Sequence, residues 1–127
     1  MKKTTLLCTI DKKIIDHFSL ATDNCEVYIG EDNFSHMETN HPNDFKKYSK
    51  DIADIIKYPD YIACNPSKKT SIEFIKQYRI NNEYVLVAVR ATQSGVFFAR
   101  TLFVMDPVKV TKYLNSGFMK PARKILK

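Results

Sequence analysis

Two histidines five positions apart, His36 and His41, carry the side chains best suited to proton transfer in this 127-residue chain. An unperturbed imidazole titrates at about pH 6.5, so it can accept and release a proton near neutrality. On a continuous helix, residues with this spacing point about 140° away from each other. Pro42 disfavours helical backbone at His41, which frees this histidine to turn toward the same cleft as His36. The pair is therefore predicted to act as a general acid and a general base.

Two other interpretations of the pair remain open. A zinc site needs a third ligand, and Glu38 faces elsewhere on the helix, without the His-Glu-x-x-His arrangement of zinc proteases. Both histidines can instead be structural, with one of them capping the helix. The third histidine, His17, is interpreted as a packed or surface residue.

Basic, hydroxyl and aromatic side chains in the second half of the chain extend the set of candidates. Lys76 alternates with apolar and aromatic residues, so it either extends its cation at a sheet edge or positions a charge for a phosphate. Arg90 ends one apolar strand, and Arg100 and Thr101 interrupt the next, where a charge needs a partner or water. By simple alternation, Thr101 is expected to share a face with Ala99, although threonine is also an ordinary strand residue.

Several common kinds of site are excluded by the sequence. It has no glycine-rich phosphate loop, no Ser-His-Asp spacing and no two-metal carboxylate pattern. The remaining inventory of His, Lys, Arg and Thr favours chemistry without a metal or another cofactor.

Charge is divided unevenly along the chain. Residues 1–60 hold eight lysines and eleven acidic residues, a balance of −3, and residues 61–127 hold eight lysines, four arginines and three acidic residues, a balance of +9. The two balances add to the net charge of +6. A basic half beside an acidic half indicates a surface that faces a polyanion, the alternative being a solvated basic face without a specific ligand.

The composition predicts one compact domain. A hydrophobic fraction of 44% supplies a real core, and 127 residues are too few for two. Three cysteines without a CxxC motif argue against a disulfide scaffold and favour a reducing compartment, so a cytoplasmic location is expected. No stretch approaches the roughly 20 apolar residues of a membrane-spanning helix, and no membrane association is predicted.

The elements that must position these residues fall into two groups. The first group begins with a strand at Thr5–Ile10 or a lead into a helix over Lys12–Leu20, and a short strand follows at Glu26–Ile29. A helix is then expected from Glu31 to about Thr39. The group ends with a helix from Asn43 or Asp44 to Pro59, in which apolar residues recur at helical spacing. Strands are expected at Tyr61–Cys64, Ser71–Ile80, Tyr84–Arg90 and Val96–Val104, with hairpin turns at 81–82 and 92–95.

These elements predict an α+β fold. N-terminal helices pack on a roughly four-stranded antiparallel meander, and a short helix follows, begun by Asp106-Pro107 and ended by Gly117. The core is expected at about residues 26–118, with residues 119–127 as a loose basic tail.

The order of motifs resembles the phage-associated branch of the barnase–EndoU–colicin–RelE-like (BECR) nuclease superfamily. The resemblance rests on Val27-Tyr28-Ile29, His36, His41-Pro42, Tyr58-Pro59-Asp60-Tyr61-Ile62, Phe74-Ile75-Lys76, Leu86-Val87-Ala88-Val89 and Thr101. It implies an RNase-like fold whose active cleft lies on the open face of the sheet. Asn40 stands where arginine is common before the second histidine, and Tyr58 replaces an asparagine, which leaves the contacts to substrate open.

The resemblance implies a metal-independent endoribonuclease, and specifically a toxin or effector of a phage or mobile element. His36 and His41 then share the acid and base roles, Lys76 stabilises the transition state and Thr101 binds phosphate, while Tyr78, Arg90 and Arg100 position the RNA. The toxin interpretation also predicts a tight-binding acidic inhibitor protein. The alternative is a non-catalytic module on the same fold that binds RNA or a protein.

Overall fold

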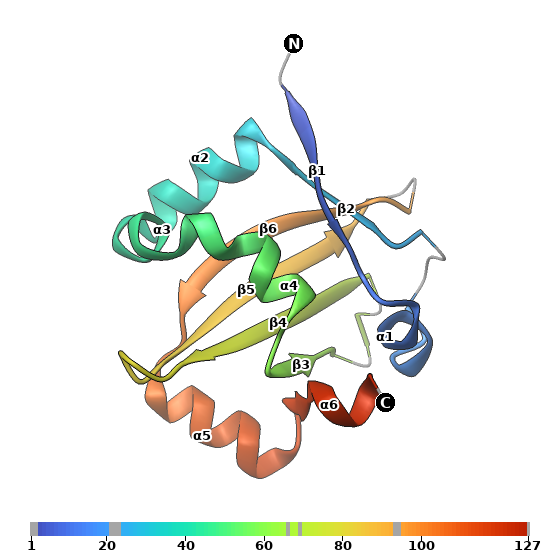
Figure 1. The fold of residues 1–127 in the computed structure, drawn as a ribbon, viewed down its shortest axis with the longest axis vertical. Coiled ribbons are helices and arrows are strands. Elements are labelled where there is room, and N and C mark those ends of the chain that lie inside the picture. The colour runs from blue at the N-terminus through green and yellow to red at the C-terminus, as the bar shows by residue number, and fades with distance from the viewer. Residues whose placement is uncertain (1–2, 21–23, 66, 69, 93–94, 127) are drawn as a thin grey trace.

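The computed structural model describes residues 3–20, 24–65, 67–68, 70–92 and 95–126, which form an α+β fold around one sheet. The sheet has seven strands in the order β1-β2-β6-β5-β4-β3-β7, and its neighbours are antiparallel except for the parallel pair of β2 and β6 (Figure 1). The strands are β1 Thr4–Thr9, β2 Glu26–Gly30, β3 Tyr61–Ala63, β4 Ser71–Tyr78, β5 Glu83–Ala91, β6 Phe97–Val104 and β7 Lys120–Pro121.

The helices of the described residues are short. They are α1 Lys12–His17, α2 Glu31–Asn40, α3 Pro42–Tyr48, the 3-10 turn η1 Ser49–Asp51, α4 Ile52–Lys57, α5 Pro107–Ser116 and α6 Ala122–Ile125. None of them is long and apolar enough to cross a membrane.

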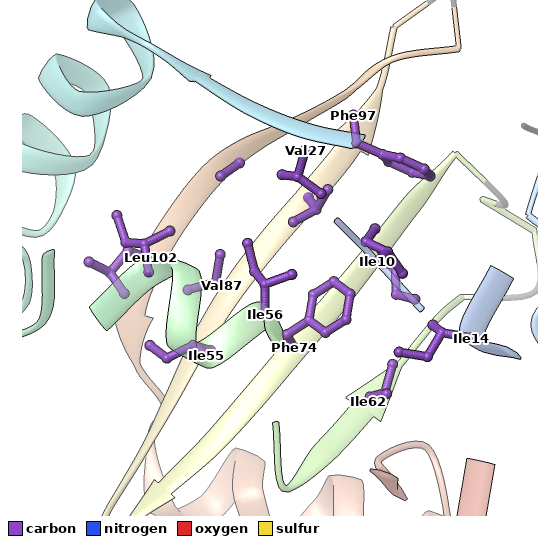
Figure 2. Close-up of a cluster of buried hydrophobic side chains, with 14 of the residues drawn as sticks. Ile10, Ile14, Val27, Ile55, Ile56, Ile62, Phe74, Val87, Phe97 and Leu102 are labelled. Atoms are coloured by element: carbon purple, nitrogen blue, oxygen red, sulfur yellow. The ribbon is translucent and has the colours of Figure 1, made fainter. Parts of the chain in front are cut away.

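One face of the sheet, the α4 face, holds the main hydrophobic core. Alternate residues of the central strands point to this face and are fully buried, among them Phe74, Val87 and Leu102. Figure 2 shows Ile55 and Ile56 of α4 beside these side chains. Because the apolar stripe of α4 meets the apolar rows of β4 and β5, burial fixes both the helix and the register of the strands.

The opposite face, the α5 face, is covered only in part. A second cluster joins Ile75 and Leu86 of the sheet to Val110 of α5. The rest of this face carries polar, small and half-buried side chains. The helix itself begins and ends as the sequence predicts, because Asp106 accepts a hydrogen bond from the Val108 amide at 2.8 Å and Gly117 adopts a φ of 75°.

The strand count differs from the sequence prediction of about four strands. β3, β4, β5 and β6 are successive antiparallel neighbours, but β1 and β2 extend the sheet beyond β6, and β7 extends it beyond β3. The turn after β4 includes Asn82 at a φ of 52°, as its position predicts. The turn predicted at 92–95 includes residues 93 and 94, which lie outside the described residues.

Two helical predictions need correction. The helix expected from Asn43 or Asp44 to Pro59 is divided by η1, where Tyr78 of β4 donates a hydrogen bond to Asp51 at 2.9 Å. The segment 119–126 is not loose, because β7 pairs with β3 and the Ala122 amide donates to the Asp60 carbonyl at 3.0 Å. Ala122 and Ile125 are buried in the main core, a contribution that so short an apolar pattern does not reveal.

Candidate active site

A row of three paired residues crosses the middle of the α5 face. Glu73 of β4 pairs with Ala88 of β5, and Ala88 pairs with Thr101 of β6. Residues directly opposite each other in a sheet point to the same face, so Glu73 and Thr101 flank the small side chain of Ala88. We call these three residues the central row.

A β-bulge sets the direction of Thr101. Ala88 pairs with Thr101 and Val89 pairs with Ala99, so Arg100 is the extra residue on β6. The bulge reverses the expected alternation: Ala99 is fully buried in the main core, whereas Thr101 lies on the other face. The expectation that Thr101 and Ala99 share a face is therefore wrong.

His41 is held beside the central row by the junction of two helices. Its amide donates to the Met37 carbonyl at 3.0 Å and ends α2, and Pro42 then begins α3. Asp44 of α3 accepts a hydrogen bond from the Val104 amide of β6 at 3.0 Å, which fixes this junction to the sheet. The half-buried imidazole consequently stacks on Phe103, with ring centroids 5.2 Å apart and planes 30° apart.

Phe103 connects His41 with the rest of the α5 face. It lies two residues after Thr101 on β6, and therefore on the same face. The ammonium of Lys109 lies 5.6 Å from the centre of the Phe103 ring. On the other side of the central row, exposed Arg90 pairs with Phe98 of β6. A histidine, a hydroxyl, a carboxylate and two cations thus lie along the α5 face on either side of Ala88.

Glu73 is the candidate that the sequence analysis missed. Its Oε1 atom is buried and has no hydrogen-bond partner within the described part of the chain. Burial raises the pKa of its carboxyl, while the charge of Lys109 acts in the opposite direction. A pocket of about 230 Å³ lies beside it, lined also by Ala63, Asn65, Lys68, Ser71, Tyr113 and Phe118. The available signal was an acidic residue between Ile72 and Phe74 in the basic half of the chain.

Lys76 and Tyr78 lie on the α4 face, away from the central row. The Lys76 ammonium donates a hydrogen bond to the Tyr58 carbonyl at 2.9 Å, just after the last turn of α4. The Tyr78 ring lies 4.7 Å from the Tyr48 ring, and burial together with the hydrogen bond to Asp51 raises the pKa of its phenol. Both side chains are engaged in attaching helices to the sheet.

His36 lies on the exposed side of α2, whereas Arg100 directly precedes Thr101 at the bulge of β6. Met37 is the buried residue of α2. Around the helix axis, exposed His36 points about 100° to one side of Met37, and His41 points about 40° to the other side. Arg100 lines a pocket of about 250 Å³ at the start of α2, near Glu31 and Asp32. Of the residues chosen from the sequence, Thr101 lies in the central row and His41 stacks on Phe103 on the same face. Arg90 lies two residues from Ala88 on β5, and Arg100 directly precedes Thr101 on β6.

The described residues contain no group of three His, Cys, Asp or Glu side chains arranged to hold a metal ion. The arrangement around Ala88 instead offers proton-transferring groups beside cations, which suits chemistry at a phosphodiester.

Comparison with known proteins agrees with this inventory. A family model described as phage-Barnase-EndoU-ColicinE5/D-RelE like nuclease 3 matches residues 8–112, a range that includes the central row, His41 and Lys109. No curated protein and no solved structure shows significant similarity to the chain. Because the family model covers most of the sequence, the chain belongs to the phage-Barnase-EndoU-ColicinE5/D-RelE like nuclease 3 family.

Proposed function

We propose that this nuclease-family protein is a metal-independent endoribonuclease whose active site is the region around Ala88 on the α5 face. The observation that carries the proposal is the central row, which sets the Glu73 carboxylate and the Thr101 hydroxyl on the face where His41 stacks on Phe103. The excess of positive charge in residues 61–127 supports a polyanionic substrate.

The proposed reaction is an internal transesterification. Glu73 accepts the proton of a ribose 2′-hydroxyl as that oxygen attacks the adjacent phosphorus. The bond from phosphorus to the 5′-oxygen of the next nucleotide breaks, and His41 in its protonated form donates a proton to this leaving oxygen. The products are a 2′,3′-cyclic phosphate and a free 5′-hydroxyl, so no water and no metal ion enters this step.

The other residues around Ala88 act on the charge of the phosphate. Thr101 donates a hydrogen bond to a phosphoryl oxygen, and Arg90 and Lys109 stabilise the negative charge that grows there in the transition state. Glu73 is preferred to His36 as the base because it shares a face with Thr101, and because burial raises its pKa toward the working pH.

We also propose that the enzyme serves as a toxin or effector, as its membership of a phage-associated family suggests. An inhibitor protein would then present acidic side chains to the basic surface beside Arg90 and Lys109. Retention of cleavage activity in the presence of such an acidic protein encoded alongside the enzyme would argue against this role.

The proposed activity is tested by incubating the purified protein, in EDTA, with a single-stranded RNA and with a DNA of the same sequence. The RNA is expected to be cut and the DNA to remain intact, because only ribose supplies the 2′-hydroxyl nucleophile. Cleavage of the DNA, or cleavage that requires a divalent ion, would contradict the mechanism. RNA that is bound in a salt-dependent manner but never cut would identify a binding module instead.

Replacement of Lys76 by methionine is expected to lower the free energy of unfolding by about 1 kcal/mol, because the Tyr58 carbonyl loses its charged hydrogen-bond donor. The rate of RNA cleavage should change less than threefold, since this side chain lies on the α4 face. Urea denaturation and a cleavage assay on the same preparation give the two values. A loss of cleavage of a hundredfold or more in a folded variant would place Lys76 in the catalytic site.

A further inference from the structure

A larger pocket, of which the proposed reaction uses only Lys109, lies along one side of α5. Its volume is about 650 Å³. We call it the α5 pocket, and its lining residues are Asp106, Val108, Lys109, Lys112, Tyr113, Ser116 and Phe118.

The walls of the α5 pocket expose apolar surface that the fold does not bury. Val108 is 77% exposed, because α5 packs on the second core cluster through Val110. The rings of Tyr113 and Phe118 meet edge to face with centroids 4.8 Å apart, and both side chains are only half-buried. A valine beside two aromatic rings forms an apolar surface suited to a flat ring of a ligand.

The α5 pocket adjoins the proposed active site. Tyr113 and Phe118 line both this pocket and the pocket beside Glu73. Lys109 connects the same regions, because its ammonium lies 5.3 Å from the centre of the Tyr113 ring and 5.6 Å from that of Phe103, on which His41 stacks. A strand of RNA that passes the central row therefore has a continuous path to α5.

The charges of the α5 pocket suit a nucleotide. Lys109 and Lys112 contribute two cations for backbone phosphates. The carboxylate of Asp106 already accepts the hydrogen bond of the Val108 amide at 2.8 Å, at the positive end of the helix dipole. Aromatic rings beside lysines are the combination with which proteins bind unpaired bases of single-stranded nucleic acid.

We propose that the α5 pocket binds an unpaired nucleobase of the RNA substrate, outside the scissile phosphodiester. This inference rests on the proposed cleavage of RNA, and it predicts a preference for single-stranded substrates that extend beyond the two nucleotides at the cut.

The first test measures binding of a single-stranded 2′-O-methyl oligonucleotide, which lacks the nucleophile and cannot be cut. Val108→Asp is expected to weaken binding about tenfold, because it removes the apolar wall and adds a negative charge. Thr111→Asp is the matched control: it adds the same charge to an exposed position of α5 that lies outside the α5 pocket, and it should weaken binding less than threefold. An equal effect of the two variants would show general charge repulsion and overturn the proposal.

The second arm uses a series of the same oligonucleotide in which one base at a time is removed. One abasic position should weaken binding to the wild type about tenfold and have no further effect on Val108→Asp. If every abasic oligonucleotide binds the wild type as well as the intact one, only phosphates are recognised and the proposal fails.

A spectroscopic measurement makes the test independent of the aspartate variants. The chain contains no tryptophan, so Val108→Trp introduces a single indole into the α5 pocket, and Leu114→Trp introduces one on the other side of α5. The oligonucleotide should quench the fluorescence of the first variant and leave that of the second nearly unchanged. Equal quenching of the two variants, or no quenching of either, would contradict base binding. The absence of quenching would fit a protein ligand better. Because nothing is cleaved in these assays, their failure is distinct from a failure of the wild type to cut RNA.

Discussion

Replacement of Glu73 by glutamine is expected to slow RNA cleavage by about two to four orders of magnitude, since the amide cannot accept the proton of the 2′-hydroxyl. The shape of the side chain is nearly unchanged, so the packing of β4 against β5 should be kept. The measurement is the single-turnover rate of cleavage, because it isolates the chemical step from product release.

The same substitution is expected to stabilise the folded protein at neutral pH. Burial raises the folded-state pKa of Glu73 above the unfolded value of about 4.3. At pH values between these two pKa values, the folded protein binds more protons than the unfolded chain. Stability therefore falls as pH rises through that interval, and glutamine removes this loss. Urea denaturation at pH 4 and pH 8 should show a gain for Glu73→Gln that is larger at pH 8.

Glu83→Gln is the matched control for both effects. Hydrogen bonds from Lys47 and Tyr48 hold the pKa of Glu83 below its ordinary value, so its stabilising contribution is present above about pH 4.3 and is lost as pH falls through the folded pKa. This variant should be less stable than the wild type at neutral pH and should cut RNA at the wild-type rate. A Glu73→Gln variant that is both unstable and inactive would indicate a structural role for Glu73 instead.

Replacement of His41 by alanine is expected to reduce cleavage by about a thousandfold, because the leaving 5′-oxygen loses its proton donor. The backbone hydrogen bonds that end α2 and begin α3 do not involve the imidazole, so the fold should be retained with the loss of only the contact to Phe103. Single-turnover rates of His41→Ala and the wild type are compared, because they isolate the chemical step from product release.

His36→Ala provides the control for this experiment on the same pair of helices. Its side chain is exposed on α2, away from the Met37 side that packs on the core, and cleavage should change less than threefold. If His36→Ala abolishes cleavage as His41→Ala does, the two histidines work together as the sequence resemblance implies, and the role assigned to Glu73 is contradicted.

The parts of the fold that depend on local signals could be predicted from the sequence. Runs of β-branched and aromatic residues marked β4, β5 and β6, and Asp106 with Pro107 marked the start of α5. Pro42 likewise indicated that the helix does not continue through His41, and α2 ends at Asn40. Each of these signals acts over a few residues, where backbone and capping preferences decide the outcome.

The composition of the site depended on features that sequence spacing does not encode. The bulge at Arg100 changes which residues of β6 share a face, and so it decides the direction of Thr101. Alternation along β4 shows that Lys76 and Glu73 lie on opposite faces of the sheet. Because both faces of β4 carry apolar residues, alternation does not show which of the two faces holds the main core. The pairing of Glu73 with Ala88 and Thr101 joins three strands, and only the register of the sheet reveals it.

The most direct test of the proposed mechanism is the chemical analysis of RNA fragments made by the wild-type protein in EDTA. Attack by the 2′-hydroxyl predicts fragments that end in a 2′,3′-cyclic phosphate and begin with a 5′-hydroxyl, and their absence from reactions with His41→Ala and Glu73→Gln would assign the cut to the α5 face. Fragments that carry a 5′-phosphate and a free 3′-hydroxyl would instead require attack by water, and would contradict the proposed mechanism.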